Sequence, residues 1–227
     1  MGLGSFVARA AIDAAAKQAE MKRKLKGRTP DQQKVIKYFY GDAGCLSKGM
    51  SDAEYEEMLK RTVANIDFKR KALNKIGLDE SEVSEIQPVH FEGYVFDEKR
   101  AYARRGSDNV WRSSMYQISW LFFSDTQVYV YQYTLNMDED GKKETTQEYF
   151  YRDITNFSSV SDTVEQETVD KISCTGKTSY KRSQVTTDKF TLIVPGDKFY
   201  CAMEQDSYSE SAIQGMKAKL REKKNNQ

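Results

Sequence analysis

The chain contains little of what catalytic and metal centres are usually built from. Its 227 residues include one histidine, His90, and three cysteines that lie far apart, Cys45, Cys174 and Cys201. A single imidazole excludes a metal site with several histidine ligands, and no Gly-x-Ser-x-Gly turn surrounds any serine. We therefore expect no enzymatic activity, no metal and no cofactor. A hydrolase that uses paired carboxylates is the one enzymatic alternative that the residues leave open.

Long apolar runs are also absent. The uncharged stretch from Ile118 to Phe123 is typical of the longest, and Arg9 and Asp13 interrupt the apolar N-terminus. No segment approaches the length of a transmembrane helix, and the interruptions argue against a secretory signal. An odd number of cysteines without paired spacing favours a reducing compartment. We expect a cytoplasmic protein, with peripheral attachment to a membrane as the alternative.

The chain has almost no net charge. Lys and Arg total 35 and Asp and Glu total 34, so no overall field favours nucleic acid or an anionic membrane. We expect no nucleic acid partner, and any anionic partner has to be recognised by a local patch. Hydrophobic residues make up 39% of the chain and aromatic residues 12%, which favours a folded protein although the mean hydropathy is -0.73.

Residues 1–86 are expected to be helical. The predicted helices lie near residues 4–26, 30–40 and 52–76. The first segment is rich in alanine, the sequences beginning at Thr29 and Ser51 have the pattern of helix starts, and Gly77 can end the third helix. Residues 1–30 contain seven basic and two acidic side chains, so the first helix is either solvated or binds a surface or a partner.

From Pro88 onward the apolar residues recur at every second position, which predicts β-strands. Residues 89–96 are the first strand candidate. Seven further strands are predicted from Ser114 on. They lie at residues 114–123, 127–135, 146–152, 154–160, 164–174, 185–194 and 198–203.

A last helix is predicted at residues 208–222. It follows a capping-box pattern from Ser207 to Glu210, and its apolar side chains share one face. These side chains are Ile213, Met216 and Leu220. We expect this face to close the open end of a β-domain that comprises residues 87–227. The predicted fold is α+β: an N-terminal α-helical region is followed by an antiparallel seven-stranded β-sandwich or partly open barrel, which the C-terminal helix caps.

Two groups of basic residues are candidates for ligand binding. The first group precedes the first long strand and consists of Arg100, Arg104, Arg105 and Arg112. The second group surrounds the loop between the fifth and sixth of the seven strands and consists of Lys171, Lys177, Lys181 and Arg182. Guanidinium and ammonium groups in loops can hold phosphate, and Tyr102, Trp111 and Tyr180 are interleaved with them. Acidic neighbours such as Asp108 weaken the local field, so the alternative is two solvated loops.

The order of seven short antiparallel strands and one amphipathic helix resembles the pleckstrin-homology-like superfold, which includes the GRAM-like domains. Residues 111–222 look like its bacterial members, and the segment from Glu148 to Phe157 is similar to the junction between their third and fourth strands. The resemblance implies a domain that works through its edges. Members that bind phosphoinositides use a basic first hairpin loop, whereas the corresponding turn here is Ser124-Asp125.

These features predict a non-enzymatic interaction or scaffold module that binds a protein partner through its β-domain. The alternative is peripheral binding to an anionic membrane, or to a phosphorylated ligand, through the basic N-terminal helix and the basic loops. The oligomeric state is left open by the sequence.

Overall fold

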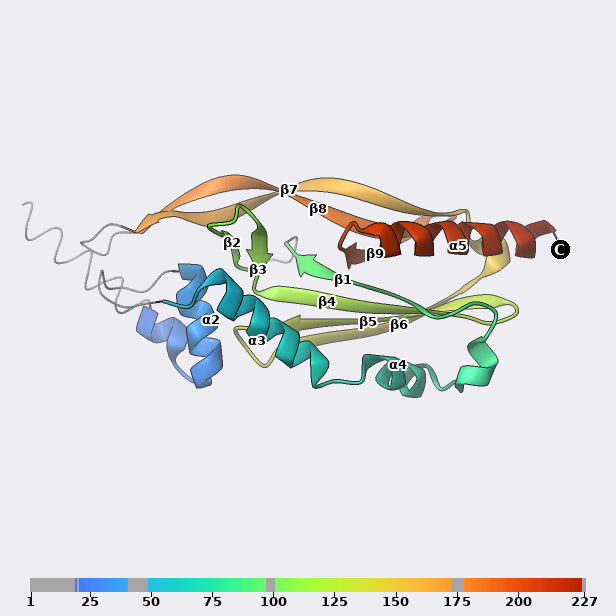
Figure 1. Ribbon diagram of the computed structural model, residues 1–227, viewed down its shortest axis with the longest axis horizontal. Helices are drawn as coiled ribbons and strands as arrows, with labels where there is room; N and C mark the ends of the chain where they lie inside the picture. Colours follow the sequence, from blue (N-terminus) through green and yellow to red (C-terminus); the bar gives the residue numbers. More distant parts are fainter. Residues whose placement is uncertain (1–18, 20, 41–48, 97–100, 173–177, 226–227) are drawn as a thin grey trace, which may run out of the picture.

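The computed structural model describes residues 19, 21–40, 49–96, 101–172 and 178–225, with the main chain alone at 167, 169–172 and 178–181 (Figure 1). These residues form an α+β fold, as predicted, and both sheets are open instead of closing into a barrel. The predicted helix 4–26 lies mostly outside the described residues, although 21–25 are helical. The helices that follow are α2 (Pro30–Tyr40), α3 (Asp52–Ala64), α4 (Phe68–Ile76) and the short 3-10 helix η1 (Glu80–Val83).

The first two of these helices start at the residues that the sequence indicated. The side chain of Thr29 accepts a hydrogen bond from Gln32 N at 3.3 Å, and Thr29 N donates one to Gln32 Oε1 at 3.0 Å. Ser51 and Glu54 make the equivalent reciprocal bonds at the start of α3. Each pair satisfies two amide groups that have no partner within the helix, so the helix begins there.

The prediction of a single helix over residues 52–76 is wrong. α3 ends at Ala64, and Asp67 starts α4 by accepting a hydrogen bond from Arg70 N at 3.0 Å. An aspartate carboxylate at this position satisfies an otherwise unpaired amide and favours a new helix over continuation of the old one. α4 ends at Gly77, as predicted, with a φ of 85° in the left-handed region that glycine adopts without strain.

The strands form two sheets. The first, called the central sheet here, has the order β1-β4-β5-β6 and consists of β1 (Val89–Val95), β4 (Met115–Phe123), β5 (Gln127–Asn136) and β6 (Lys142–Phe150). The second, called the outer sheet, has the order β3-β2-β7-β8-β9 and consists of β2 (Ala103–Arg105), β3 (Trp111–Ser113), β7 (Asn156–Ile172), β8 (Thr178–Val194) and β9 (Asp197–Met203). All pairings are antiparallel except the short contact between β2 and β7, which is parallel.

The prediction of seven strands after Ser114 is wrong by one, because the described residues from there on form six. The predicted strands 154–160 and 164–174 are parts of the single 17-residue strand β7, which pairs with an equally long β8. The polar residues between the two segments include neither Gly nor Pro, and they have cross-strand partners instead of forming a turn. The hydroxyl of Ser161 donates to Asp188, and Asp162 lies 3.6 Å from Lys189 Nζ.

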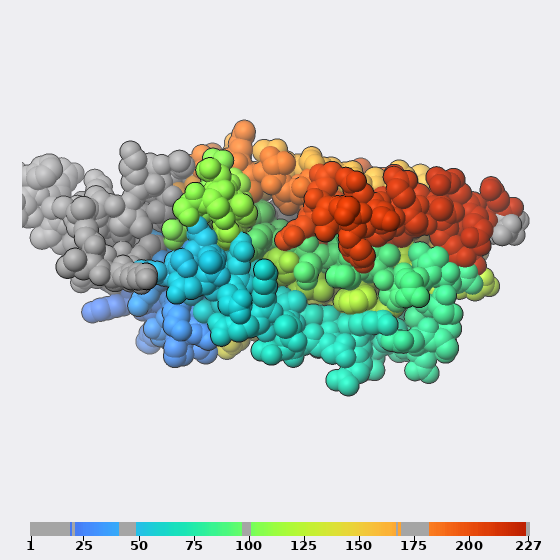
Figure 2. All heavy atoms as spheres, viewed as in Figure 1, coloured from blue at the N-terminus to red at the C-terminus, as the bar shows by residue number. Residues whose placement is uncertain are grey.

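The central sheet is the middle of three layers. Figure 1 shows α2, α3 and α4 along one face and the outer sheet with α5 along the other. Alternation along β4 and β5 supplies both cores: Ile118 and Tyr131 are buried toward the helices, whereas Leu121 and Val130 are buried toward the outer sheet. In Figure 2 the atoms of α3 and α4 and those of α5 accordingly lie on opposite sides of an elongated body. The helical region and the strands therefore share a hydrophobic core.

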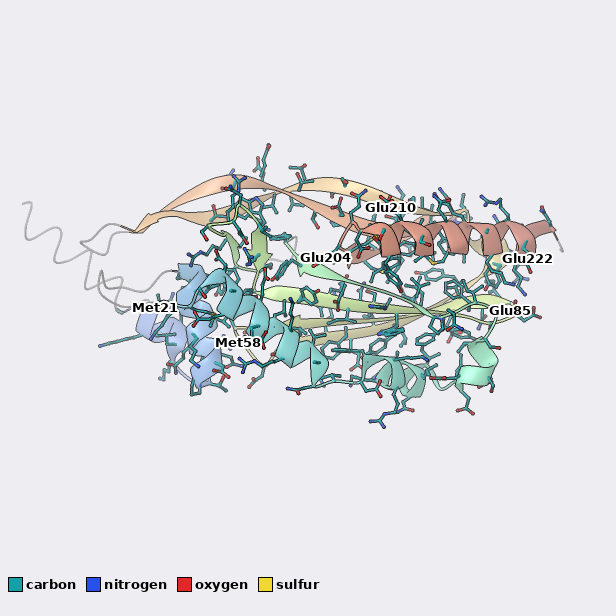
Figure 3. The ribbon with its side chains drawn as sticks, viewed as in Figure 1. Met21, Met58, Glu85, Glu204, Glu210 and Glu222 are labelled. Atoms are coloured by element: carbon teal, nitrogen blue, oxygen red, sulfur yellow. The ribbon has the colours of Figure 1, made fainter. Side chains whose placement is uncertain are left out.

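Helix α5 (Ser207–Asn225) packs on the core between the sheets, as predicted, through Ile213, Met216 and Leu220. Lys219 Nζ lies 2.6 Å from a carboxylate oxygen of Glu85, a residue that Figure 3 labels near the C-terminal half of the helix. The predicted capping box from Ser207 to Glu210 is shifted by one residue. Asp206 instead accepts from Ser209 N at 2.8 Å and donates its own N–H to Ser209 Oγ at 3.0 Å.

Candidate functional site

The two predicted basic groups come close in the outer sheet but are only partly described. Arg100 and Lys177 lie outside the described residues, and Lys171 and Lys181 are described by their main chain alone. β2, which carries Arg104 and Arg105, pairs with β7 at Thr168, and Lys181 of β8 is the partner of Thr168 on the other side. The main-chain segments of the two groups are therefore neighbours.

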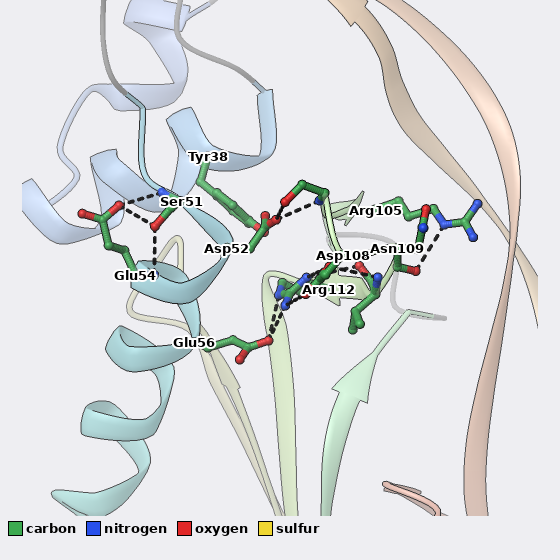
Figure 4. Close-up of polar contacts among 11 residues, drawn as sticks. Tyr38, Ser51, Asp52, Glu54, Glu56, Arg105, Asp108, Asn109 and Arg112 are labelled. Atoms are coloured by element: carbon green, nitrogen blue, oxygen red, sulfur yellow. Dashed lines mark hydrogen bonds and ion pairs between the residues drawn. The ribbon is translucent and has the colours of Figure 1, made fainter.

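Arg112 is held by acidic partners within the protein. Its side chain is 3% exposed, and its Nη2 lies 2.6 Å from Asp108 Oδ2 while its Nε donates to Glu56 Oε1 at 2.9 Å (Figure 4). The hydrogen bonds from Arg112 hold the pKa of Asp108 well below its usual range, and those to Asp108 raise the pKa of Arg112. This guanidinium ties α3 to the β2–β3 turn, so its charge is already compensated.

The other described arginines face different partners. Arg104 Nη1 donates to the carbonyl of Tyr38 at 2.5 Å, and its guanidinium lies 4.6 Å from the centre of the Tyr38 ring. Arg105 is exposed and donates from Nε to the carbonyl of Asn109 at 3.2 Å. Arg182 is exposed on β8. The described members of the two groups therefore do not converge on one ligand position, and phosphate binding stays a prediction.

A second polar contact fixes the helices on the same turn. Asp52 accepts a hydrogen bond from the hydroxyl of Tyr38 at 2.8 Å and two from Ser107, at 2.8 and 2.9 Å (Figure 4). Burial opposes the charge of Asp52, but these hydrogen bonds outweigh it and lower the pKa of the carboxyl. The hydroxyl of Tyr55 donates to the buried carbonyl of Ser113 at 2.6 Å. The start of α3 is thus held over β3 by hydrogen bonds as well as by packing.

Between α3 and the edge of the central sheet the protein has a groove of about 740 Å³, which we call the β1 groove. It is lined by Glu56, Leu59 and Lys60 of α3, by Glu92, Gly93 and Tyr94 of β1, by Trp111 and Tyr116, and by Asp188, Met203 and Glu204 on the side of the outer sheet. Figure 3 labels Glu204 in the region between α3 and the start of α5. The lining thus combines aromatic surface with several carboxylates.

Gly93 is needed where β9 passes over β1. A Cβ atom at this position would lie 3.0 Å from Met203 N and 3.3 Å from Met203 C, closer than side chains normally approach main chain. The absent side chain therefore lets the end of β9 reach β1, where Glu204 N donates to the carbonyl of Glu92 at 3.1 Å. This contact brings the carboxylates of Glu92 and Glu204 to the same groove.

The β1 groove has an excess of negative charge. Among the described residues of its lining, Lys60 is the one basic residue against four acidic ones, of which Glu56 is paired with Arg112. Neither Glu92 nor Glu204 has an ion pair with another described residue. Loss of solvent, together with the charges of Glu92, Asp206 and Glu56, raises the pKa of Glu204. Burial raises the pKa of Tyr94 and of Tyr116, so both hydroxyls stay protonated at neutral pH. The groove therefore offers a cation aromatic walls and two carboxylates, Glu92 and Glu204, that have no ion pair with a described residue.

These residues were not among the candidates predicted from the sequence. The one local sign of this site in the sequence is the carboxylate of Glu92, which shares a strand face with the aromatic side chains of His90 and Tyr94. Glu56 and Glu204 come from segments far from β1 along the chain, and only the fold brings the three carboxylates together.

Comparison with protein-family models, curated proteins and solved structures finds no match to this chain. The pleckstrin-homology-like resemblance stays a prediction. Among the described residues, none of the helices combines the length and the hydropathy that a bilayer-spanning segment requires.

Proposed function

We propose that the protein is a non-enzymatic binding module that engages a protein partner through the β1 groove, and that the partner places a Lys or Arg side chain there. The observation that supports this most directly is the pair Glu92 and Glu204, two carboxylates that have no ion pair with a described residue, in a groove with aromatic walls. The volume of about 740 Å³ lies in the range of sites that enclose several side chains or a small ligand.

The lining suits both parts of a long basic side chain. Tyr94, Trp111 and Tyr116 can pack against its methylene groups, and the faces of the rings also attract a cation. The carboxylates of Glu92 and Glu204 can accept hydrogen bonds from its head group. A basic partner residue would thus match both the aromatic and the acidic residues of the lining.

The electrostatics of the free protein favour the same occupant. Glu204 is exposed, yet partial loss of solvent and then repulsion by nearby carboxylates raise its pKa, so its negative charge is less stable in the groove than in water. A bound cation would relieve this repulsion, whereas a bound anion would increase it. Charge complementarity therefore favours a basic segment over the phosphorylated or lipid ligands considered from the sequence.

The test uses the full chain and four pools of fluorescent octapeptides whose central residue is fixed as Arg, Lys, Ala or Glu. Fluorescence polarisation should show binding of the Arg and Lys pools and weaker or no binding of the Ala and Glu pools. The double variant Glu92→Gln, Glu204→Gln should weaken binding of the Arg pool by about 10-fold to 100-fold, the range expected when a close charge pair is removed.

A matched control is the double variant Glu148→Gln, Glu165→Gln, which changes the net charge equally at exposed positions on β6 and β7, outside the groove. It should leave the affinity for the Arg pool unchanged. Acidification should weaken binding, because Glu204 takes up a proton at a higher pH than an ordinary glutamate. Partial burial and the charges of Glu92, Asp206 and Glu56 raise its pKa, and the charge of Lys60 opposes this only in part. Equal binding of all four pools, or equal losses in the two double variants, would contradict the proposal.

A further inference from the structure

β1 is an edge strand of the central sheet, and only some of the main-chain groups on its outer edge make hydrogen bonds with described residues. His90 N donates to the hydroxyl of Tyr208 at 3.2 Å, and the carbonyl of Glu92 accepts from Glu204 N at 3.1 Å. Both bonds leave β1 on the side away from β4. Main-chain groups of an edge strand alternate between its two sides, so the even-numbered residues of β1 direct theirs to the outer edge.

Tyr94 is the next residue in this alternation. Its pairing with Tyr116 continues the register of β1 and β4 without a bulge, so its N–H and C=O also point outward. Neither group makes a hydrogen bond to another described residue. Tyr94 also lines the β1 groove, so a residue of the groove lining carries this main-chain donor and acceptor.

We propose that the partner segment binds in extended conformation as an added strand, with main-chain hydrogen bonds to Tyr94 and a Lys or Arg side chain against Glu92 and Glu204. This inference rests on the proposed function and specifies how the same groove is used. Strand addition derives affinity from main-chain bonds and specificity from pockets for alternate side chains. The β1 groove supplies both, with α3 along one side of the edge and Asp188 of β8 along the other.

The opposite edge of the central sheet, β6, has a feature by which natural proteins prevent edge strands from pairing. β6 carries Lys142, Lys143, Glu144 and Glu148 along its length. Charged residues along an edge strand oppose addition of another strand. The outer edge of β1 has instead been partly covered by Glu204 and Tyr208, which leaves the short stretch at Tyr94 beside the groove. Addition at β1 is therefore favoured over addition at β6.

The experiment takes the tightest-binding peptide of the Arg pool and methylates its main-chain nitrogens one at a time. N-methylation removes a donor and disfavours pairing, so we expect losses of about tenfold or more at alternate positions next to the Arg and little change at the positions between them. Amide hydrogen exchange, read by NMR, should slow at Tyr94 N–H when this peptide is bound. The N–H groups of β6 should exchange at the same rate with and without it.

The outcomes separate this inference from the proposed function. A peptide that depends on Glu92 and Glu204, but shows no alternation on N-methylation and no protection of Tyr94 N–H, would overturn strand addition and leave the binding module intact. Protection along β6 instead of β1 would also overturn it. Failure of the Arg and Lys pools to bind would overturn both proposals.

Discussion

The two faces of the central sheet are covered in different ways. Toward α2, α3 and α4 the buried surface is rich in tyrosine, and the hydroxyls of Tyr38, Tyr55 and Tyr131 all donate hydrogen bonds, to Asp52, Ser113 and Glu144. Toward the outer sheet and α5 the core consists mainly of aliphatic residues and phenylalanine. Burial of apolar surface thus dominates the face toward the outer sheet. On the face toward the helices, side-chain hydrogen bonds also position the helices, and the β1 groove lies beside α3.

The largest expected effect is on the apolar face. Leu220 of α5 is 5% exposed and packs in the core between the sheets. Leu220→Ala should lower the free energy of unfolding by roughly 2–4 kcal/mol, because it removes buried methyl groups and leaves a cavity. Urea unfolding followed by circular dichroism measures this. Gln214→Ala, at an exposed position of the same helix, should change the stability by less than about 0.5 kcal/mol. Equal effects of the two substitutions would mean that α5 does not contribute to this core.

A smaller loss of stability is expected when the hydrogen bonds of Arg112, which hold α3 on the sheet, are removed. Arg112→Met keeps an unbranched side chain but removes the hydrogen bonds to Glu56 and Asp108, so we expect a loss of roughly 1–3 kcal/mol. The exposed neighbour Arg105 provides the control, because Arg105→Met should cost less than about 0.5 kcal/mol. Differential scanning calorimetry of both variants makes the comparison. If Arg112→Met were as stable as the control, packing alone would hold α3 on the sheet.

The smallest predicted effect has the opposite sign. Asp138, in the turn between β5 and β6, is 3% exposed, and its Oδ1 has no hydrogen-bond partner among the described residues. Burial raises the pKa of this carboxyl. The folded protein therefore binds the proton more tightly than the unfolded chain, and its stability falls as the pH rises from the pKa of the unfolded carboxyl through that of the folded one.

Asp138→Asn should accordingly stabilise the protein at pH 7, by on the order of 1 kcal/mol, a typical size for single substitutions. The gain should shrink on acidification and disappear below about pH 4, where an ordinary aspartate is protonated in the unfolded chain as well. Thermal melting of wild type and variant between pH 3 and pH 8 would show this, and a gain that is constant with pH would show that the charge of Asp138 is not its cause.

Local signals in the sequence were sufficient for most elements. Ser51 with Glu54 marked the start of α3, and the alternation in β4 and β5 identified both strands. Errors arose where two local preferences compete. Asp67 divides a stretch whose apolar spacing suits one helix, and the polar residues around Ser161 continue a strand because partners on β8 pair with them.

The candidate site depends on contacts that no local pattern contains. Arg112 belonged to a predicted basic group, yet Glu56, distant in sequence, neutralises it together with Asp108. The carboxylates of Glu92 and Glu204 meet because Gly93 lets β9 pass close to β1. A sequence shows which charges exist, but whether each is compensated is decided by the tertiary fold.

The most direct test of the account is to map where a basic peptide binds. Amide chemical shifts of the isotope-labelled full chain would be followed during titration with the tightest-binding peptide of the Arg pool. We expect the largest changes at Lys60, Tyr94 and Glu204, around the β1 groove. Changes centred on Arg104 and Arg182, with the groove unaffected, would contradict it.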